Sequence, residues 1–360
     1  MPELRTVLMT ADTVGGVFTY VVTLASELAK AGITVHVATM GPPARHAQRA
    51  RALAVPGLVL HEGDFALEWM DDPWDEVEEA GKWLLALERD LRPDVVHLNG
   101  YAHGVLDFQA PVLVVAHSCV LSWWRAVLRE DAPARYEPYR RIVRAGLQGA
   151  DAVVAVSRSM RTCLERHYGP IRDVTVVHNG APPPTGAGVE REKEPFVLSC
   201  GRVWDRAKNI ETLARAAAHV PWPVKVAGWD SHAHAGVESL GWLGRDELDA
   251  VMERAAIFAL PALYEPFGLS ALEAAQRGAA LVLGDIPSQR EIWGDAAVYV
   301  DPTDEFDIAE AITALVRSPE RRAELSRRAR ERAALYTASR MAAGILDAYR
   351  TAWSRRRACA

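Results

Sequence analysis

The 360-residue sequence predicts an α/β fold made of two doubly wound parallel-sheet domains. Short apolar runs of strand length alternate with helical patterns, an order that is typical of a parallel sheet covered by helices on both faces. This alternation starts again near residue 196, after a segment rich in proline and glycine. At 360 residues with 49% hydrophobic content, the chain is also too long for one compact core, and its length suits two domains of roughly 150 to 200 residues each.

The first half opens with a buried-type strand at Thr6–Thr10, followed by a turn at Gly15 and Gly16. A helix is expected over Val17–Ala31, where apolar residues recur at helical spacing, and Gly32 ends it. The further strands of this half are expected at Thr34–Ala38, Leu58–His61, Val95–Leu98, Val112–Ala116 and Ala152–Val156.

The second half repeats the pattern, with a strand at Phe196–Cys200 and a helix at Asn209–His219. Its other strands are expected at Val224–Ala227, Ala256–Leu260, Ala280–Leu283 and Val298–Val300. Between the halves, Ala181–Gly188 has the composition of a linker. We therefore expect an N-terminal domain over residues 1–185 and a second domain over residues 190–337.

Charge and cysteine usage narrow the class of protein. A formal net charge of −6 argues against a general nucleic-acid binder. The basic run Arg355–Arg357 is interpreted as a solvated helix end, and contact with an anionic membrane surface is the less favoured alternative. No targeting segment is visible, and no apolar run approaches the ~20 residues that a membrane span needs. No Cys-x-x-Cys pair occurs, so we expect reduced thiols in a cytoplasmic protein at Cys119, Cys163, Cys200 and Cys359.

The most informative stretch contains two carboxylates, Glu265 and Glu273, which a Pro-x-Gly turn and a helix start connect. The apolar run before it places Glu265 beyond the carboxyl end of a strand. The backbone N–H groups of Phe267, Gly268 and Leu269 are then the donors of a helix start, and they face any anion or hydroxyl in the crevice. Glu273 lies one or two turns further in, where a carboxylate can accept two hydrogen bonds from a vicinal diol such as a ribose. The pattern indicates a site for a sugar nucleotide.

Two cations follow the first strand of the second half. Arg202 offers a guanidinium that can hold phosphate oxygens with two parallel hydrogen bonds, and Lys208 offers a mobile point charge. Transfer of a sugar from a nucleoside diphosphate requires such cations, because the departing pyrophosphate carries several negative charges. The alternative is a surface pair that caps a loop.

The segments Gly201–Asn209 and Glu265–Glu273, in this order, resemble the retaining glycosyltransferases of family 4. Weaker matches, at Gly15 and Gly16 and around His117, extend the resemblance over nearly the whole chain. The resemblance implies a GT-B fold, in which two Rossmann-like domains face a central cleft. It also implies that the last helix, within residues 338–360, packs back on the N-terminal domain.

The resemblance further implies roles for the residues of the second domain. Arg202 and Lys208 would contact the diphosphate in place of a metal ion, so we expect neither a metal nor another cofactor. Glu265 would contact the sugar near O3, and the backbone amides after it would hold O3 and O4. Glu273 would bind the ribose. The segment that ends at Leu243 would contact the base through its backbone, which leaves uracil, guanine and adenine open.

The first domain would contribute phosphate and sugar contacts. Gly15 and Gly16 lack side chains that would keep a phosphate from the backbone. His117 ends an apolar strand, and its counterpart in relatives bonds the hydroxymethyl group of the donor sugar or lies beneath the reacting carbon. His97 either lines the acceptor side or is a structural histidine that bonds to backbone.

Acceptor recognition is expected from loops of the first domain. Trp123 and Trp124 could stack on a sugar or an aromatic group, although a core role for one of them is equally compatible with the sequence. The arginines at Arg140, Arg141 and Arg144 would lie near a membrane if the acceptor were a lipid, which the acidic net charge disfavours. The acceptor is therefore a small molecule, a saccharide or a lipid.

The leading interpretation is a metal-independent retaining glycosyltransferase that moves a hexosyl group from a UDP or GDP sugar to an acceptor hydroxyl. No carboxylate is placed as a nucleophile on the far face of the sugar, which favours a same-face route in which the leaving phosphate takes the acceptor's proton. One alternative is another enzyme of this architecture, such as a phosphorylase or a nucleotide-sugar epimerase. Another is a non-catalytic protein that binds nucleotide sugars. Such a non-catalytic protein would be expected to lose one of the four charged residues Arg202, Lys208, Glu265 and Glu273.

Overall fold

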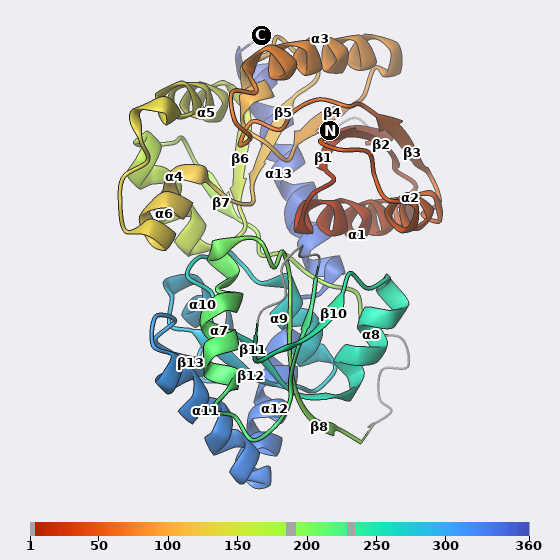
Figure 1. Cartoon of the computed structure of the whole chain (residues 1–360). Helices are drawn as coiled ribbons and strands as arrows, with labels where there is room; N and C mark the ends of the chain where they lie inside the picture. Colours follow the sequence, from red (N-terminus) through yellow and green to blue (C-terminus); the bar gives the residue numbers. More distant parts are fainter. Residues whose placement is uncertain (1–3, 185–191, 229–234, 360) are drawn as a thin grey trace. The chain divides into compact units, whose positions relative to one another are not determined.

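The computed structural model describes residues 4–184, 192–228 and 235–359, and divides into two compact units. The first unit comprises Met1–Arg125, Glu130–Gly180 and Ala338–Ala360, and the second comprises Ala126–Arg129 and Ala181–Thr337. Each unit contains one parallel sheet with helices, so the expected fold class of two Rossmann-like α/β domains is confirmed (Figure 1). Half of the expected linker, residues 185–188, and the charged residues Glu190 and Arg191 after it lie outside the described part of the chain.

The first unit has a seven-stranded sheet in the order β3-β2-β1-β4-β5-β6-β7. Its strands are β1 (Thr6–Asp12), β2 (Thr34–Met40), β3 (Leu58–Glu62), β4 (Val95–Leu98), β5 (Val112–Ala116), β6 (Ala152–Ala155) and β7 (Val174–Val176). All neighbours pair in parallel, with β1 between β2 and β4. Strands β4, β5 and β6 are buried along their whole length, which explains their continuous apolar sequences. Strand β7 was not expected from the sequence.

Helices cover both faces of this sheet. They are α1 (Gly16–Lys30), α2 (His46–Leu53), α3 (Trp74–Leu91), α4 (Val120–Trp123), α5 (Glu137–Gly149), α6 (Arg158–Tyr168) and α13 (Ala338–Cys359), with the short helical segments η1 (Ala102–Val105) and η3 (Ala134–Tyr136). A further short segment, η2 (Trp124–Leu128), begins in this unit, and its last three residues are assigned to the second. Helix α1 packs against α13 on one face, and α3 lies on the opposite face (Figure 1). The C-terminal helix also packs on β5 and β6.

Ion pairs attach the end of α13 to the first unit. The guanidinium of Arg356 lies 2.9 Å from the carboxylate of Asp151, and Arg355 donates to the Asp151 carbonyl over 3.0 Å and pairs with Asp173. The interpretation of this basic run as a solvated helix end was therefore wrong for these two arginines. Their guanidiniums hold the helix to the loops beside β6.

The second unit has a six-stranded parallel sheet in the order β10-β9-β8-β11-β12-β13. Its strands are β8 (Glu194–Cys200), β9 (Val224–Ala227), β10 (Glu238–Gly241), β11 (Ala255–Leu260), β12 (Ala280–Gly284) and β13 (Val298–Val300). The short edge strand β10, with two exposed residues, was not expected from the sequence.

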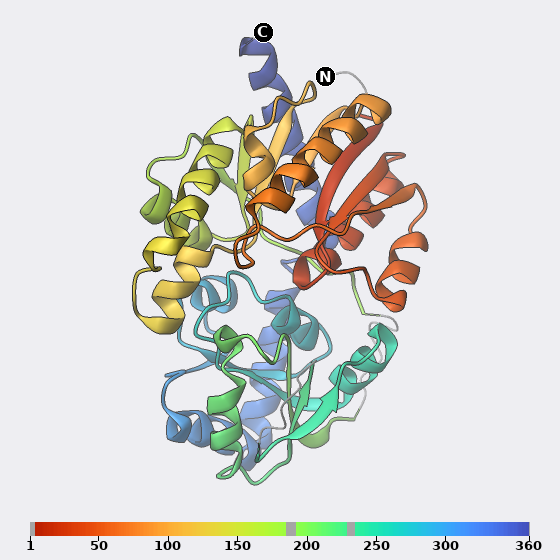
Figure 2. The ribbon, with the colours of Figure 1, turned by 45° about the horizontal axis from the view of Figure 1, so that its top comes forward.

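The helices of the second unit form two groups around this sheet. They are η4 (Arg206–Lys208), α7 (Ile210–Ala217), α8 (Arg245–Arg254), α9 (Leu269–Gln276), α10 (Pro287–Trp293), α11 (Glu305–Arg317) and α12 (Pro319–Ala333). Helices α7 and α11 pack together and share a core with one face of the sheet, whereas α12 packs on α9 and β12. Figure 2 shows the helices of both groups beside the strands of this unit. This arrangement leaves the carboxyl ends of the strands to carry the loops that bear the charged motifs.

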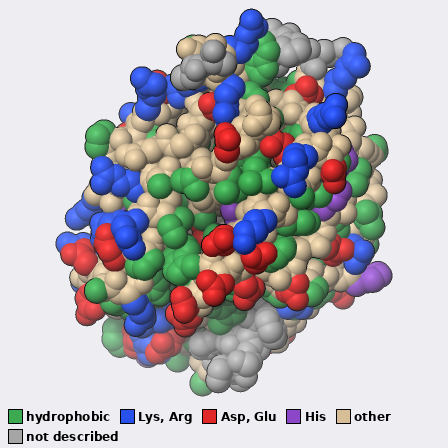
Figure 3. All heavy atoms as spheres, turned by 90° about the horizontal axis from the view of Figure 1, so that it is seen from above, with side chains coloured by type: hydrophobic (Ala, Val, Ile, Leu, Met, Phe, Trp, Pro, Cys, Tyr) green, Lys and Arg blue, Asp and Glu red, His purple; other side chains and the backbone are tan. Residues whose placement is uncertain are grey.

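The face seen in Figure 3 mixes Lys and Arg with Asp and Glu. In the part of the chain that the structure describes, no helix combines the length and the apolar run that crossing a bilayer requires. Cys119, Cys163 and Cys200 form no disulfide within the described residues, and the side chain of Cys359 lies outside them.

Candidate functional site

The second unit reverses its strand order between the neighbouring strands β8 and β11. In open α/β sheets, ligands bind outside the carboxyl ends of the strands at such a reversal point. The loop after β8 carries Arg202 and Lys208, and the loop after β11 carries Glu265. The topology therefore brings the two charged motifs of the sequence to one edge of one sheet.

The ammonium of Lys208 donates a hydrogen bond to the carboxylate of Glu265, and the two side chains are only 14% and 12% exposed. The aliphatic part of Lys208 lies over Gly201, where an added Cβ would be 3.7 Å from the lysine carbons. The backbone amide of Leu263 donates to the Ala207 carbonyl over 2.9 Å and ties the two loops together. A partly buried cation and anion therefore form one charge pair at the reversal point.

Arg202 has a different partner. Its guanidinium lies 2.8 Å from the Asp205 carboxylate, which also accepts a hydrogen bond from the Ala207 amide over 3.0 Å. The guanidinium carbon lies 5.6 Å from the ring centroid of Trp204, and that tryptophan is 48% exposed. Asp205 thus holds the arginine in the loop after β8, with 36% of its side chain exposed.

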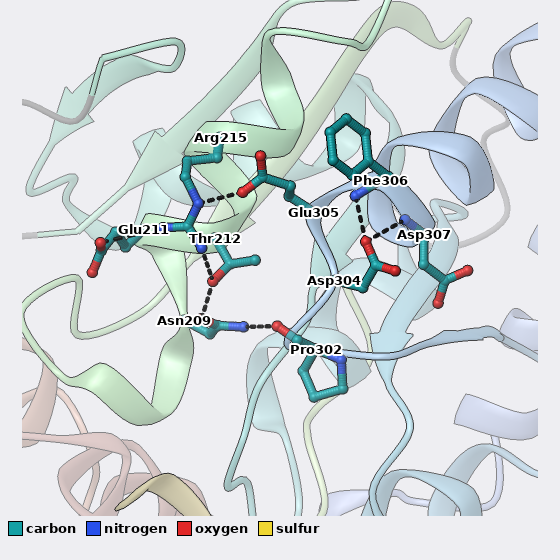
Figure 4. Close-up of polar contacts among 9 residues, drawn as sticks. All are labelled: Asn209, Glu211, Thr212, Arg215, Pro302, Asp304, Glu305, Phe306 and Asp307. Atoms are coloured by element: carbon teal, nitrogen blue, oxygen red, sulfur yellow. Dashed lines mark hydrogen bonds and ion pairs between the residues drawn. The ribbon is translucent and has the colours of Figure 1, made fainter.

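The side chain of Asn209 bonds Pro302 and Thr212 (Figure 4), and in this way Asn209 fixes the backbone next to Lys208. Its φ of 58° is left-handed, a conformation that asparagine tolerates better than most residues. Its side-chain amide donates to the carbonyls of Pro261 over 2.9 Å and Pro302 over 2.5 Å, just beyond β11 and β13. The hydroxyl of Thr212 donates to the remaining amide oxygen over 2.7 Å. These bonds hold the end of the motif against two strand ends.

The turn before α9 depends on Gly268. This glycine is the N-cap of the helix, with a φ of +94°, and an added Cβ would lie 3.0 Å from the side-chain nitrogen of Gln289. Phe267 is buried, and its carbonyl accepts a hydrogen bond from Gln289 over 3.3 Å, while Leu269 begins the helix. Among the described residues no side chain caps this helix start. Its N-terminus can therefore attract an anion or a hydroxyl oxygen.

Glu273 is paired with an arginine that the sequence analysis did not identify. The guanidinium of Arg245, at the start of α8, lies 2.6 Å from the Glu273 carboxylate and also bonds Asp249. Arg277 reaches the same Asp249 over 2.7 Å. Leu243, two residues before Arg245, is half-buried in the loop that enters α8. The ion pair thus joins the predicted ribose ligand to the start of α8, just after the predicted base segment.

The thiol of Cys200 lies among these charges at the end of β8. Burial, and then the negative charge of Glu273, raise the pKa of this thiol to about 12, although Arg245 and Lys208 oppose the shift. The thiol is therefore protonated at neutral pH. We assign Cys200 a packing role.

The first unit reverses its strand order between β1 and β4. Gly15 is the N-cap of α1 and Gly16 its first residue, directly beyond β1. In the described residues, no side chain caps this helix, and no acidic residue occupies its first turn. The Asp12 carboxylate accepts a hydrogen bond from the amide of Val14 over 2.5 Å and so shapes the turn before the glycines. This helix start also has the features of an anion-binding N-terminus.

His117 lies just beyond β5, with its ring half-buried. Its Nε2 is 2.7 Å from the side-chain oxygen of Asn99, and its ring meets that of Tyr20 edge-on, with 4.5 Å between centroids. Burial lowers the pKa of His117 to about 3. The imidazole is therefore neutral at physiological pH.

His97 is completely buried on β4. It bonds the hydroxyl of Tyr349 on α13 over 2.7 Å and the side chain of Asn99 over 3.2 Å. Of the two interpretations left open by the sequence, the structure supports a structural histidine. Its partners are side chains rather than the expected backbone groups.

The two tryptophans after β5 pack on each other and on their neighbours. Trp123 and Trp124 meet edge-on at 6.1 Å, and Tyr136 packs on Trp124 at 5.6 Å. The guanidinium of Arg135 lies over the Trp124 ring at 5.8 Å. Residues of this chain therefore already contact the ring of Trp124 that was considered for stacking on an acceptor.

Glu68 is a buried carboxylate that was not predicted from the sequence. Glu68 accepts hydrogen bonds from the backbone amides of Tyr101 over 3.0 Å and Ala102 over 2.7 Å. Burial raises the pKa of Glu68 to about 7, because it outweighs these two bonds, and Asp12 adds to the shift. No motif surrounds Glu68, so only the tertiary structure shows that it joins the turn after β4.

Comparison with known proteins identifies the family. The model of Glycosyltransferase Family 4 matches residues 14–183, and that of Glycosyl transferases group 1 matches residues 186–332. The chain therefore belongs to the family 4, group 1 glycosyltransferases and is an enzyme of the glycosyltransferase type, as the sequence motifs implied.

Curated relatives share moderate identity with the chain. A glycogen synthase of Mycobacterium tuberculosis is 29% identical over 69% of this chain and 66% of its own length. An alpha-maltose-1-phosphate synthase of Mycolicibacterium smegmatis is 30% identical over 66% of this chain and 70% of its own length. A D-inositol 3-phosphate glycosyltransferase of Xylanimonas cellulosilytica is 28% identical over 95% of this chain and 93% of its own length. The chain thus spans about two thirds of the glycogen synthase that it matches.

Solved structures share the fold at low identity. Sucrose-phosphate synthase from Thermosynechococcus elongatus has a TM-score of 0.80 at 21% identity, covering 97% of this chain and 99% of the other. Anabaena HepE, solved with UDP and glucose, has a TM-score of 0.72 at 15% identity, and the match covers 95% of this chain and 98% of the HepE chain. These similarities confirm the GT-B fold expected from the resemblance.

Proposed function

We propose that this protein is a retaining glycosyltransferase that moves a hexosyl group from a nucleoside-diphosphate sugar to an acceptor hydroxyl, without a divalent metal ion. The observation that carries the proposal is the Lys208–Glu265 pair at the reversal point of the second sheet, beside the uncapped start of α9. A cation, a carboxylate and a helix N-terminus together match the charges of a sugar diphosphate.

The second unit supplies the groups assigned to the donor. Lys208 and Arg202 stabilise the departing diphosphate, because guanidinium and ammonium groups are worth most where negative charge develops in the transition state. Glu265 and the start of α9 hold the sugar hydroxyls. Glu273, kept in place by Arg245, accepts hydrogen bonds from the ribose.

In the first unit, the start of α1 at Gly15 and Gly16 and the half-buried ring of His117 are the groups assigned to the substrates. A neutral imidazole can hydrogen bond a sugar hydroxyl without adding charge near an oxocarbenium-like carbon. The reaction follows the same-face route, in which the leaving phosphate oxygen takes the proton of the acceptor and the anomeric configuration is retained.

The names of the relatives support a sugar donor and a hydroxyl-bearing acceptor. HepE was solved with UDP and glucose, and other relatives are named for glycogen, maltose 1-phosphate and inositol 3-phosphate. We therefore propose a UDP or GDP hexose as donor and a saccharide or polyol, with or without a phosphate group, as acceptor. The three described cysteines without a disulfide support a reducing, cytoplasmic location.

A thermal-shift panel of UDP, GDP and ADP and their hexose derivatives tests the donor. A ligand at about 100 times its Kd adds about 2.7 kcal/mol to stability, so the true nucleotide raises the melting temperature clearly above the others. The anomeric configuration of the product, read by proton NMR, then tests retention. An inverted product, or no response to any nucleotide, contradicts the proposal.

A further inference from the structure

A chain of side chains in the first unit connects the C-terminal helix with His117. It runs from Tyr349 on α13 to His97 on β4, then to Asn99 beyond β4, and ends at His117 beyond β5. Tyr349 and His97 are fully buried. The chain of contacts lies entirely inside one unit and joins residues that are 252 positions apart in the sequence.

The orientation of Asn99 can be deduced from its neighbours. Its Nδ2 lies 2.7 Å from the carbonyl oxygen of Thr10, an atom that can only accept. Its backbone amide donates to the Thr10 hydroxyl over 2.8 Å, which fixes the residue further. A flipped amide would place two oxygens against each other, so Oδ1 must face the histidines.

The tautomers of both histidines follow from that orientation. Oδ1 of Asn99 lies 3.2 Å from Nε2 of His97 and 2.7 Å from Nε2 of His117, and an oxygen can only accept. Both rings must therefore carry a proton on Nε2. Nδ1 of His97 then has a lone pair, which accepts a hydrogen bond from the hydroxyl of Tyr349 over 2.7 Å. Burial keeps the pKa of Tyr349 well above its ordinary value, so this hydroxyl stays protonated.

One polar atom at the end of the chain remains available. With Nε2 of His117 committed to Asn99, its Nδ1 presents a lone pair, and this atom has no hydrogen-bond partner within residues 4–184, 192–228 and 235–359. The edge contact with Tyr20 restrains the ring plane. A neutral ring held in this way accepts a hydrogen bond and cannot donate one from Nδ1.

We propose that Tyr349, His97 and Asn99 are positioning residues that hold His117 as the Nε2–H tautomer, so that its Nδ1 accepts a hydrogen bond from a hydroxyl group of the substrate. The inference rests on the proposed function, because it assigns the hydroxyl to a sugar. It assigns the C-terminal helix a part in substrate recognition through the hydroxyl of Tyr349. A ligand whose only nearby atom is an acceptor, such as a carboxylate oxygen, would be repelled at this position.

The tautomers can be measured directly. Two-dimensional proton–nitrogen NMR of the full chain labelled with ¹⁵N-histidine distinguishes Nε2–H, Nδ1–H and doubly protonated rings, and replacement of each histidine assigns the signals. We expect one protonated and one unprotonated nitrogen in both His97 and His117 near neutral pH, with the proton on Nε2. A protonated Nδ1 on His117 would overturn the inference.

Two variants test the chain of contacts. Tyr349→Phe removes the donor to His97, and Asn99→Leu removes the acceptor that the two rings share. We expect mixed tautomers at His97 in the first variant and at His117 in the second. We expect kcat/KM to fall about threefold to tenfold in the first and more than tenfold in the second, mainly through kcat.

Tyr168→Phe is the matched control, since it removes a hydroxyl that is buried in the same unit and lies 3.0 Å from the sulfur of Cys119. We expect it to change neither the His117 signals nor kcat/KM. Unchanged tautomers in Asn99→Leu would contradict the inference even if activity fell. A single Nε2–H tautomer in the unmodified protein supports it even if no nucleotide sugar is turned over, a result that would contradict the proposed function alone.

Discussion

The ammonium of Lys208 bonds the carboxylate of Glu265, although 57 positions separate the two residues in the sequence. The pair lies where the order of the second sheet reverses, between β8 and β11. Both side chains are largely removed from water, so each depends on the other for its charge balance. Binding of a diphosphate would offer Lys208 a second anionic partner at this position.

Loss of this cation should impair turnover strongly. We expect Lys208→Met to lower kcat/KM on the donor found by the thermal-shift panel by about a hundredfold or more, equivalent to about 3 kcal/mol of transition-state stabilisation. Lys225→Met is the control, because Lys225 also pairs with a glutamate of the second unit, Glu238, over 3.4 Å. Wild-type turnover in Lys208→Met, or an equal loss in both variants, would argue against the assignment.

Glu273 should act on binding more than on chemistry. We expect Glu273→Gln to weaken nucleoside diphosphate binding by about tenfold, equivalent to about 1.4 kcal/mol, because it weakens both the bonds to the ribose and the pair with Arg245. Isothermal titration calorimetry with the diphosphate alone measures this. An unchanged Kd would remove Glu273 from the donor site.

Gly268 should be required for the turn before α9. Gly268→Ala places a side chain at φ +94° and 3.0 Å from Gln289, so we expect a loss of about 1 to 2 kcal/mol in unfolding free energy together with lower activity. Gly32→Ala is the control, since Gly32 has a φ of +74° with open space around it. Urea titrations should show a lower unfolding free energy in both variants, whereas kinetic assays should show lower activity only in Gly268→Ala. Full activity in Gly268→Ala would show that the turn tolerates change.

Acid should destabilise the first unit through its buried histidines. Burial, aided for His97 by the nearby His117, lowers the pKa of both to about 3, whereas the unfolded value is about 6.5. The unfolded chain therefore binds more protons between these values, so their stabilisation is complete above pH 6.5 and is lost as the pH falls. The slope is at most about 1.4 kcal/mol per pH unit for each histidine.

Urea denaturation at pH 7.5 and pH 5.5 tests this dependence when the unmodified protein is compared with His117→Asn. The comparison is needed because Glu68, whose pKa is raised to about 7, titrates in the same range with the opposite effect on stability and is present in both proteins. His117→Asn, which removes one titrating group, should flatten the dependence. An equal pH dependence in the unmodified protein and in His117→Asn would show that the His117 ring is not held neutral.

The sequence predicted the fold well where strands are apolar and buried. The central strands of both sheets were identified within one or two residues, because a parallel strand covered on both faces needs a continuous apolar run. The edge strands β7 and β10 were not identified, since they are short and carry exposed residues. The helix at Asn209–His219 was predicted slightly too long, because Asn209 adopts a left-handed conformation and caps it.

The candidate site was predictable where charged residues stand in recognisable sequence motifs. Lys208 and Glu265 belong to two such motifs, and their side chains come together because the strands before them, β8 and β11, are neighbours in the sheet. Arg245 could not be found in this way, since its pairing with Glu273 depends on how α8 packs on α9. Tyr349 was missed for the same reason, because only the packing of α13 brings it to β4.

In the proposed reaction, side-chain cations stabilise the leaving diphosphate without a divalent ion. The most direct test measures release of the nucleoside diphosphate from the preferred donor in excess EDTA, and again after Mg²⁺ or Mn²⁺ is restored, for the unmodified protein and for Lys208→Met. We expect an unchanged rate in EDTA for the unmodified protein and a rate at least about a hundredfold lower for the variant under both conditions. A rate that vanishes in EDTA and returns with the metal ion would rule out a metal-independent reaction.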